Sequence, residues 1–353
     1  MMYIWHMKHQ FGFFDESNRL RRLSGMGDPL EKISQVVDFE MFRPLLNGVF
    51  KREGKGQGGR PAFDHILMFK ILLLQQWYCM ADDKTEYQIN DRLSFQRFLG
   101  LTLGSKVPDA KTIWAFRESL GKNGAEKTLF SLFAEQMEHK GIITRSGSIV
   151  DASFVEAPRQ RNNRDENERI KSGEIPEEWK ESPHKLRQKD IDAHWTKKNN
   201  EKHYGYKNHV KVDKTSKLIV TYSVTDASVH DSREIVGLVE EQDQELYADS
   251  AYVGRELHKE ICKKNKNIKL KIHEKGYRNH PLTEEQKNSN REKSRIRARV
   301  EHVFGHMTQS MSGLIVRSIG KYRASCVVGL QNLAYNLSRY RYIRLSVGVK
   351  SHA

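Results

Sequence analysis

The chain has 353 residues, and its 60 lysines and arginines against 45 aspartates and glutamates give a formal net charge of +15. This length predicts two domains, or one large domain with insertions. The positive charge favours a polyanionic partner, because each lysine or arginine that neutralises a phosphate releases a counterion. The alternative is that the charge only keeps the protein soluble. Cys79, Cys262 and Cys326 form no C-x-x-C pair, so neither a disulfide framework nor a zinc site is supported.

The sequence contains no pattern typical of membrane insertion or secretion. The first residues, MMYIWHMKHQFGFFDES, lack a basic start followed by an unbroken apolar segment, so we do not expect a signal peptide. The longest apolar run, ILMFKILLL, contains Lys70 and is too short to span a bilayer. We therefore expect a soluble cytoplasmic protein with reduced cysteines and no membrane partner.

The N-terminal part divides into a lead-in and a helical region. Residues 1–58 predict a loosely structured lead-in with a short helix, closed by the basic linker KREGKGQGGRP. The linker is either a plain solvated connection or a strap that follows phosphates. The segment after Asp64, HILMFKILLLQQWYCM, is apolar on nearly every face, which indicates a buried helix.

Residues 59–142 are predicted to form an all-helical domain of short helices joined by tight turns. Pro108 and Asp109 open one of these helices, which carries Lys111, Thr112 and Arg117. This arrangement is typical of helix-turn-helix-like DNA-binding domains, so these three side chains are candidate DNA contacts. A helical domain with only a packing role fits the same pattern.

Residues 143–345 differ in residue pattern from the helical region before them, and they predict a mixed five-stranded sheet with helices on both faces. The expected strands are SIVDASFV, HYGYKNHVKVD, KLIVTYSVT, ELYAD and NIKLKIH. A helix is predicted from Asp231, with Glu234 completing a capping box. Lys207, which follows Tyr204 and Tyr206 on the second strand, is a further candidate DNA contact, although tyrosines are common in strands without any function.

A charged segment at about 156–202 interrupts the sheet between its first two strands. It is poor in branched apolar residues, and we expect a mobile, partly disordered insertion. His194, Trp195 and Lys197 could become ordered on DNA. A solvated loop with no role is the alternative.

Three acidic residues stand in distinctive surroundings. Asp151 and Asp249 lie at the ends of short β-branched runs, and Glu301 lies in a segment of helical periodicity. Clustered carboxylates are the ligands that Mg²⁺ and Mn²⁺ prefer, and two such ions about 3.5–4 Å apart support in-line phosphoryl transfer. An aspartate at a strand end is more often a turn former or a helix cap. The metal-site hypothesis therefore depends on the joint placement of the three.

The order of motifs along nearly the whole chain resembles the DDE transposases of bacterial insertion sequences, most like insertion sequence family five. The resemblance rests on these strings: GRPAFDHILMFKILLLQQWYCMAD, RFLGL, VPDAKTIWAFRESL, IVDASFVEAP, YGYKNHVKVD, TDASVHDS, YADSAYVG, RVEHVFG and GLQNLAYNLSRY. It implies an α/β fold of the ribonuclease H-like type, preceded by the all-helical N-terminal domain. It also implies that Asp151, Asp249 and Glu301 form a catalytic triad that binds Mg²⁺ or Mn²⁺, with two ions.

The same resemblance implies the function and partners of the protein. A transposase of this kind binds the terminal inverted repeats of its element as double-stranded DNA, cleaves there, and joins the freed ends to target DNA. It acts as at least a dimer, because two element ends are held together. The expected location is the cytoplasm, in association with the nucleoid.

Arg297 lies four residues before Glu301, hence on the same helical face, where it can orient the carboxylate or hold a phosphate. Related transposases often carry a Tyr-Arg-Glu-Lys grouping along this helix. This chain has Ser294 and Thr308 where the tyrosine and the lysine would fall, so the roles of those two residues are not transferred.

Two other functions remain alternatives at this stage. One is a catalytically silent DNA-binding repressor derived from a transposase, and the other is a structure-selective nuclease on the same fold. The presence of all three carboxylates favours an active enzyme over the repressor.

Overall fold

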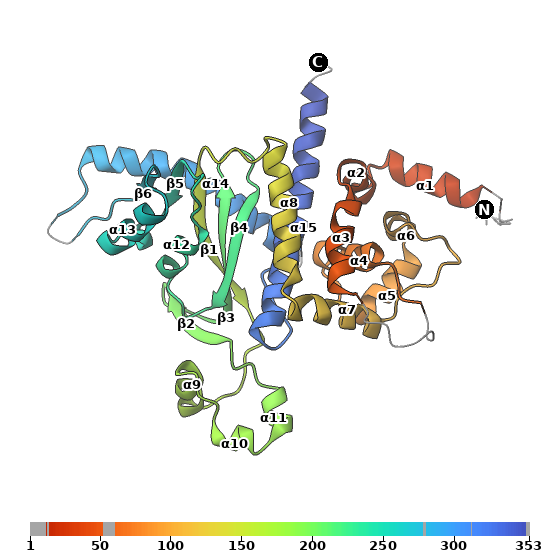
Figure 1. Cartoon of the computed structure of the whole chain (residues 1–353), viewed down its shortest axis with the longest axis horizontal. Coiled ribbons are helices and arrows are strands. Elements are labelled where there is room, and N and C mark those ends of the chain that lie inside the picture. Colours follow the sequence, from red (N-terminus) through yellow and green to blue (C-terminus); the bar gives the residue numbers. More distant parts are fainter. Residues whose placement is uncertain (1–11, 13, 52–60, 278–279, 312, 351–353) are drawn as a thin grey trace, which may run out of the picture.

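The computed structural model describes residue 12 and residues 14–51, 61–277, 280–311 and 313–350. A mixed sheet stands beside a helical N-terminal region, and α8 and α15 lie between them (Figure 1). No helix in these ranges is long and apolar enough to cross a membrane. The N-terminal region contains α1 (Asp15–Gly25), α2 (Pro29–Val36), the 3-10 helix η1 (Phe39–Phe42), α3 (Arg43–Val49), α4 (His65–Tyr78), α5 (Asp82–Asp91), α6 (Leu93–Leu99), α7 (Ala110–Lys122) and α8 (Ala125–His139).

Residues 14–51 are more ordered than predicted. From α1 to α3 they are largely helical, and Leu30, Phe42 and Leu46 are buried in the same core as α4. The expectation of a loose lead-in is therefore wrong, because its apolar residues pack against the buried helix that follows. Most of the basic linker, residues 52–60, lies outside the described residues.

Two helix predictions in this region are confirmed. α4 is buried on nearly all sides and begins after its N-cap Asp64, whose carboxylate accepts a hydrogen bond from the Leu67 backbone N–H. α7 begins after Asp109, which accepts from the Thr112 backbone N–H at 2.7 Å. Both aspartates are helix N-caps, as their position before an apolar periodic segment indicates.

The sheet has six strands in the described part of the chain, one more than predicted. Its order is β2–β3–β1–β5–β6, with β4 also paired to β3. β1 is antiparallel to β3 and parallel to β5, and β5 is parallel to β6. The additional strand, β2, comes from the predicted insertion. The strands are β1 (Ser148–Glu156), β2 (His194–Lys198), β3 (Glu201–Asp213), β4 (Ile219–Asp226), β5 (Glu245–Ala248) and β6 (Lys269–Ile272).

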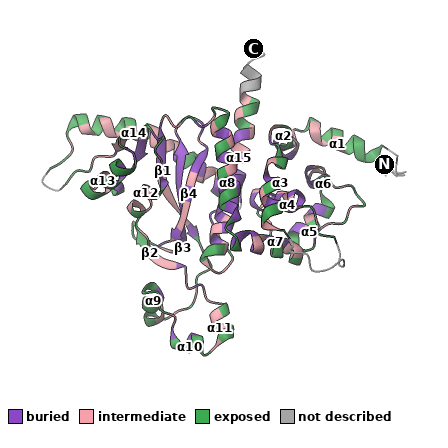
Figure 2. Ribbon diagram, in the orientation of Figure 1, coloured by how far each residue is buried: buried purple, intermediate pink, exposed green. Residues whose placement is uncertain are grey.

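Helices cover both faces of the sheet, as predicted. Val150, Leu246 and Ala248 point into one core with α12 (Ile235–Leu238) and α13 (Arg255–Lys264). Ile149 and Tyr247, on the opposite face, join the main core with α14 (Glu284–Ser310) and α15 (Lys321–Lys350). The burial of strands and central helices is visible in Figure 2. Alternate residues of a strand point to opposite faces, and this fixes which side chains meet α14.

The insertion is folded, which contradicts the expectation of disorder. It contains α9 (Arg164–Lys171), α10 (Glu177–Lys180) and α11 (Pro183–Arg187). Trp179 is fully buried, and its indole N–H donates a 2.8 Å hydrogen bond to Glu166. Asn163 and Glu166 form a capping box at the start of α9. One buried tryptophan and a capped helix give this charged segment an ordered structure that its composition does not indicate.

The helix predicted from Asp231 is short, and its predicted capping box is absent. The 3-10 helix η2 (Asp231–Arg233) and α12 replace it, and His230 is the N-cap of η2. Asp231 instead pairs with Lys207, and Glu234 accepts a 2.6 Å hydrogen bond from the Ser223 hydroxyl. Both carboxylates are used by β3 and β4, so they are not available to cap the helix.

α15 joins the helical region to the sheet. It packs against α2, α4, α7 and α8 and against β4, so the main hydrophobic core continues across the predicted boundary near residue 142. The Asn336 side chain bonds both the N–H and the C=O of Ile219, at 2.9 and 2.8 Å. Asn332 pairs with Asn208 on β3. The asparagines of the motif GLQNLAYNLSRY therefore fix α15 to the sheet.

A pH-dependent contact between α7 and α15 gives a first prediction. Glu118 accepts two 2.8 Å hydrogen bonds from Arg323, which lower its pKa from 4.5 to about 2. A lowered carboxyl pKa stabilises the fold above the pKa of the unfolded state, and this stability is lost as pH falls towards the folded value. Glu118→Gln should therefore destabilise the protein near neutral pH and progressively less between about pH 4.5 and about pH 2. Urea unfolding across this range checks it, and a pH-independent difference would contradict it.

Candidate active site

Asp151 and Asp249 lie side by side because β1 and β5 are parallel neighbours. Ile149 on β1 pairs with Tyr247 on β5. Asp151 and Asp249 each lie two residues further along the chain from this pair. A step of two residues keeps a side chain on the same face of the sheet. Both carboxylates therefore lie on the face of Ile149 and Tyr247, which α14 covers.

Arg297 on α14 approaches both carboxylates. Its Nη2 atom lies 3.6 Å from Asp151 Oδ2 and 3.8 Å from Asp249 Oδ2. These separations are ion-pair distances and are too long for strong hydrogen bonds. The Arg297 Nε atom is buried and has no hydrogen-bond partner among the described residues. The guanidinium thus keeps donors free for a further anion.

The aspartates are placed differently. Asp151 lies within β1 and accepts a 2.8 Å hydrogen bond from the Ala152 N–H. Asp249 follows β5 and caps the 3-10 helix η3 (Ser250–Tyr252) through the Ala251 N–H. The Asp151 side chain is 26% exposed and that of Asp249 is 41% exposed. The site is thus open to solvent on the side of Asp249.

The electrostatics of this pair suit a bound cation. Burial raises the pKa of Asp151, and the negative charge of Asp249 raises it further. The Ala152 N–H and the positive charge of Arg297 act in the opposite direction. A cation between the two carboxylates favours their ionised forms. The Arg297 guanidinium already lies close to both, so this pair of hard oxygen ligands fits a divalent ion.

The structure does not bring Glu301 to this pair. Glu301 is exposed on α14 and makes no hydrogen bond or ion pair within the described ranges. No three histidine, cysteine, aspartate or glutamate side chains of the described residues are grouped closely enough to hold a metal ion. The residues of α14 that are buried in the core are Val300, Val303 and Met307. Glu301 therefore lies on the side of the helix, one turn beyond Arg297. Arg297 accordingly contacts the two aspartates rather than Glu301.

Tyr252 lies close to the site, in the core on the opposite face of the sheet, and the sequence analysis did not single it out. It lies three residues after Asp249, is 2% exposed, and its hydroxyl has no hydrogen-bond partner among the described residues. Burial raises its pKa, and the negative charges of Asp231, Asp151 and Asp249 add to this. The motif YADSAYVG contains both Asp249 and Tyr252. The tyrosine three residues after the aspartate was the signal in the sequence that could have identified it.

Two residues assigned to DNA contact have structural partners instead. Arg117 makes two 2.7 Å hydrogen bonds to Asp82 and one of 3.1 Å to Gln75, which connect α7 to α5 and α4. Lys207 is buried and donates to Asp231 at 2.8 Å and to the Val229 carbonyl at 2.7 Å. Both side chains therefore have a structural role, and their assignment to DNA stays a prediction. Lys111 is exposed and Thr112 is partly exposed near the start of α7, so these two stay predictions.

The two departures from the Tyr-Arg-Glu-Lys grouping have structural roles. The Ser294 hydroxyl lies 2.8 Å from His273 Nε2, and His273 Nδ1 lies 3.2 Å from the Ala248 carbonyl. Ser294 thereby connects α14 to the end of β5, next to Asp249. The Thr308 hydroxyl bonds the Phe304 carbonyl of its own helix at 3.0 Å.

Comparisons with known proteins identify the family. The family model for the transposase DDE domain matches residues 143–337, and that for a second transposase domain, DUF772, matches residues 18–119. A solved structure, the cryo-EM structure of the piggyBac transposase synaptic complex with hairpin DNA, is similar over 93% of this chain and 78% of that chain, with 13% identity and a TM-score of 0.43. The DDE-domain match spans more than half of the chain, so the protein belongs to the DDE transposases, which cleave and join DNA with divalent metal ions.

Proposed function

We propose that this transposase binds the terminal inverted repeats of an insertion sequence of family five. It hydrolyses a phosphodiester at the element end and uses the freed 3′-hydroxyl to attack target DNA. The observation that carries this proposal is the approach of Asp151 and Asp249 to the single guanidinium of Arg297. Two carboxylates and a cationic side chain with free donors can bind a metal ion and a phosphate together.

Each polar residue of the site has a proposed role. Asp151 and Asp249 would hold Mg²⁺ or Mn²⁺, with two ions in the complete site. Glu301 would become a further ligand when bound DNA moves its side of α14 towards the sheet. Bound divalent ions activate the attacking oxygen and stabilise the leaving one. Arg297 holds and orients the scissile phosphate, because its side chain is 21% exposed and its guanidinium makes no hydrogen bond within the described ranges.

The remaining parts of the proposal concern DNA recognition and assembly. The N-terminal helices contact double-stranded DNA through Lys111 and Thr112 on α7, beside the exposed Trp114. A net charge of +15 supports non-specific attraction to the DNA backbone. The active complex contains at least two copies of the chain, because two element ends are joined, and it acts in the cytoplasm on the nucleoid.

The function is tested with the purified full-length chain and labelled duplexes that end in the inverted repeat. Cleavage at the repeat end and joining to a target duplex, both dependent on Mg²⁺ or Mn²⁺, are the expected results. Cleavage without joining would indicate a structure-selective nuclease. Sequence-specific binding without cleavage would indicate a silent repressor. No preference for the repeat over random duplex would contradict the proposal.

Arg297→Lys tests the phosphate role of the guanidinium. Lysine keeps the charge but cannot give two parallel hydrogen bonds to a phosphate. End cleavage should slow by about 10- to 100-fold, somewhat less than the usual cost of removing a donor from a transition state. Arg295→Lys is the matched control, because Arg295 is exposed on the same helix and has no ion pair within the described ranges. Single-turnover cleavage rates measure both variants, and equal rates for Arg297→Lys, Arg297→Ala and wild type would exclude the role.

A further inference from the structure

A large groove lies between the folded insertion and the edge of the sheet. It has a volume of about 910 Å³, and its walls come from α9, from the β2–β3 hairpin and from the segment 228–233. Figure 1 shows α9 beside β2, below the sheet. The floor is apolar and is formed by Ile170, Ala193, Trp195 and Val229. No role proposed above uses this groove.

The walls of the groove are held in place by interactions outside it. Trp179 fixes α9 through Glu166. The chain returning from the insertion is fixed by Asp190, whose carboxylate accepts from the buried Tyr206 hydroxyl at 2.9 Å. His194 on the groove wall lies 3.0 Å from Asp226 at the end of β4. The groove is therefore preformed rather than a gap between loose segments.

The charge of the groove is strongly positive. Its lining includes five cationic side chains and a single carboxylate, Glu168, which pairs with Arg164 at 3.2 Å. The other four cations are exposed and form no ion pair with any described residue; they are Lys171, Lys197, Lys202 and Arg233. Many cations elsewhere in the structure, such as Arg97, Arg117 and Lys211, are paired with carboxylates. Unpaired cations around an apolar floor leave a site for an anion that also has an apolar part.

One short segment connects the groove wall to the part of the chain that follows Asp249. Val229, His230 and Arg233 line the groove, and Asp231 in the same segment pairs with Lys207. η2, which contains Asp231, packs against η3, which contains Tyr252. The charges of Asp231, Asp151 and Asp249 all act on the Tyr252 hydroxyl. The segment 228–233 thus connects the groove wall to η3, the turn that directly follows Asp249.

We infer that this groove binds an unpaired stretch of a DNA strand next to the cleaved phosphodiester. Phosphates lie against the cationic rim, and one or more unstacked bases cover the apolar floor. Sites for single-stranded nucleic acid combine these two features. Duplex DNA keeps its bases stacked inside the helix and would leave the floor uncovered. The inference rests on the proposed function, since it places the strand beside the cleavage site.

The test compares the full-length protein with the rim variant Lys197→Ala/Lys202→Ala. Fluorescence anisotropy measures binding to three duplexes that end in the inverted repeat: one blunt, one with a short unpaired 3′ tail and one with a short unpaired 5′ tail. EDTA prevents cleavage. Wild type should bind one tailed duplex more tightly than the blunt duplex, and the preferred tail identifies which strand enters the groove. The rim variant should lose about tenfold or more of the affinity for that tailed duplex.

The salt dependence gives a second readout. Each phosphate contact to a single strand contributes about 0.7 to the slope of log affinity against log salt, so the rim variant should lose about 1.4 for the tailed duplex. The matched control is Lys263→Ala/Lys266→Ala, which removes the same charge from exposed lysines at the end of α13 and just beyond it, away from the groove. Lys171→Ala/Arg233→Ala, on the opposite rim, serves if the first variant does not fold.

The outcomes separate this inference from the proposed function. Equal wild-type affinity for blunt and tailed ends would overturn the groove inference, as would equal losses in the rim and control variants. In both cases, preference for the blunt repeat end over random duplex would leave the proposed function standing. If wild type prefers neither the blunt nor the tailed repeat ends to random duplex, the proposed function itself fails.

Discussion

Asp249→Asn should abolish end cleavage while DNA binding survives. Asparagine keeps the size of the side chain but removes the charge that binds a divalent ion, and it leaves Arg297 beside one carboxylate instead of two. The cleavage rate should fall by about 10²–10³-fold or more, as for other losses of transition-state stabilisation. Asp151→Asn should have the same effect. Single-turnover cleavage and anisotropy on the same repeat duplex measure the two properties separately.

Thermal unfolding gives an independent readout of the same two residues. Mg²⁺ or Mn²⁺ that binds only the folded protein should raise the melting temperature of wild type, and this rise should disappear in both variants. Without metal, Asp151→Asn should not be less stable than wild type, because burial raises the pKa of Asp151 and disfavours its ionised form. Asp83→Asn, at an exposed position on α5, is the matched control. A variant that cleaves at the wild-type rate would show that its aspartate is not a ligand.

The positions of Asp151 and Asp249 could be predicted from the sequence because they depend on local patterns. Each follows or lies within a β-branched apolar run, and parallel pairing of β1 and β5 then aligns the two residues. The predicted strands and α14 are all present, and the fold class is confirmed. Glu301 differs, because its distance from the aspartates depends on how α14 is rotated on the sheet. That rotation is set by Val300, Val303 and Met307 together with their distant partners.

The insertion could not be predicted for a different reason. Its charge indicated disorder, but Trp179 and Ile170 supply a buried centre, and β2 gains its order by pairing with β3. The structural partners of Arg117 and Lys207 could not be predicted for a related reason. Basic residues in a basic chain were assigned to DNA, whereas their carboxylate partners, Asp82 and Asp231, are distant in sequence. Long-range ion pairs leave no local pattern.

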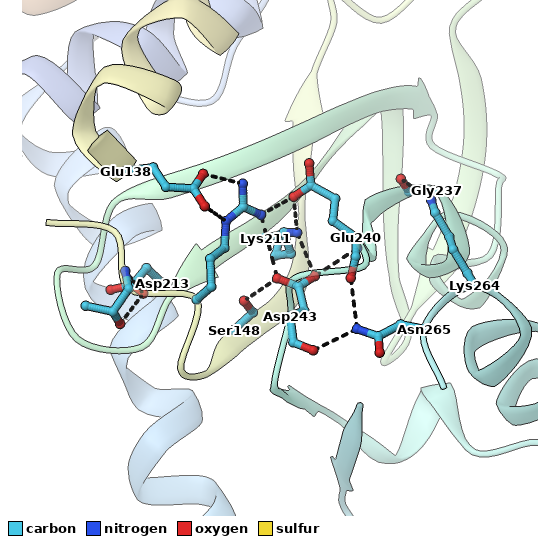
Figure 3. Close-up of polar contacts among 11 residues, drawn as sticks. Glu138, Ser148, Lys211, Asp213, Gly237, Glu240, Asp243, Lys264 and Asn265 are labelled. Atoms are coloured by element: carbon cyan, nitrogen blue, oxygen red, sulfur yellow. Dashed lines mark hydrogen bonds and ion pairs between the residues drawn. The ribbon is translucent and has the colours of Figure 1, made fainter. Parts of the chain in front are cut away.

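A buried polar network at the start of β1 illustrates such long-range pairing (Figure 3). Lys211 on β3 is fully buried and lies 2.8 Å from Asp243, which is also fully buried, and 2.5 Å from Glu240. Arg145 lies 3.7 Å from Asp243 and 2.8 Å from Glu138. The Ser148 hydroxyl donates to Asp243 at 3.3 Å. The network thus connects β3, the start of β1 and the turn that leads into β5.

Asp243→Ala should lower the free energy of unfolding by about 3–5 kcal/mol, because it leaves the Lys211 ammonium buried without its fully buried partner. Lys211→Met/Asp243→Leu should be less destabilising than the sum of its two single changes, since no unpaired charge remains from the pair. Urea unfolding of the four proteins completes this cycle. Lys259→Met, which breaks the exposed pair with Glu256, is the control and should change stability little. If Asp243→Ala changed stability no more than this control, the network would not be a determinant of the fold. The arrangement of β1 and β5, which places Asp151 beside Asp249, would then depend on the apolar cores of the sheet alone.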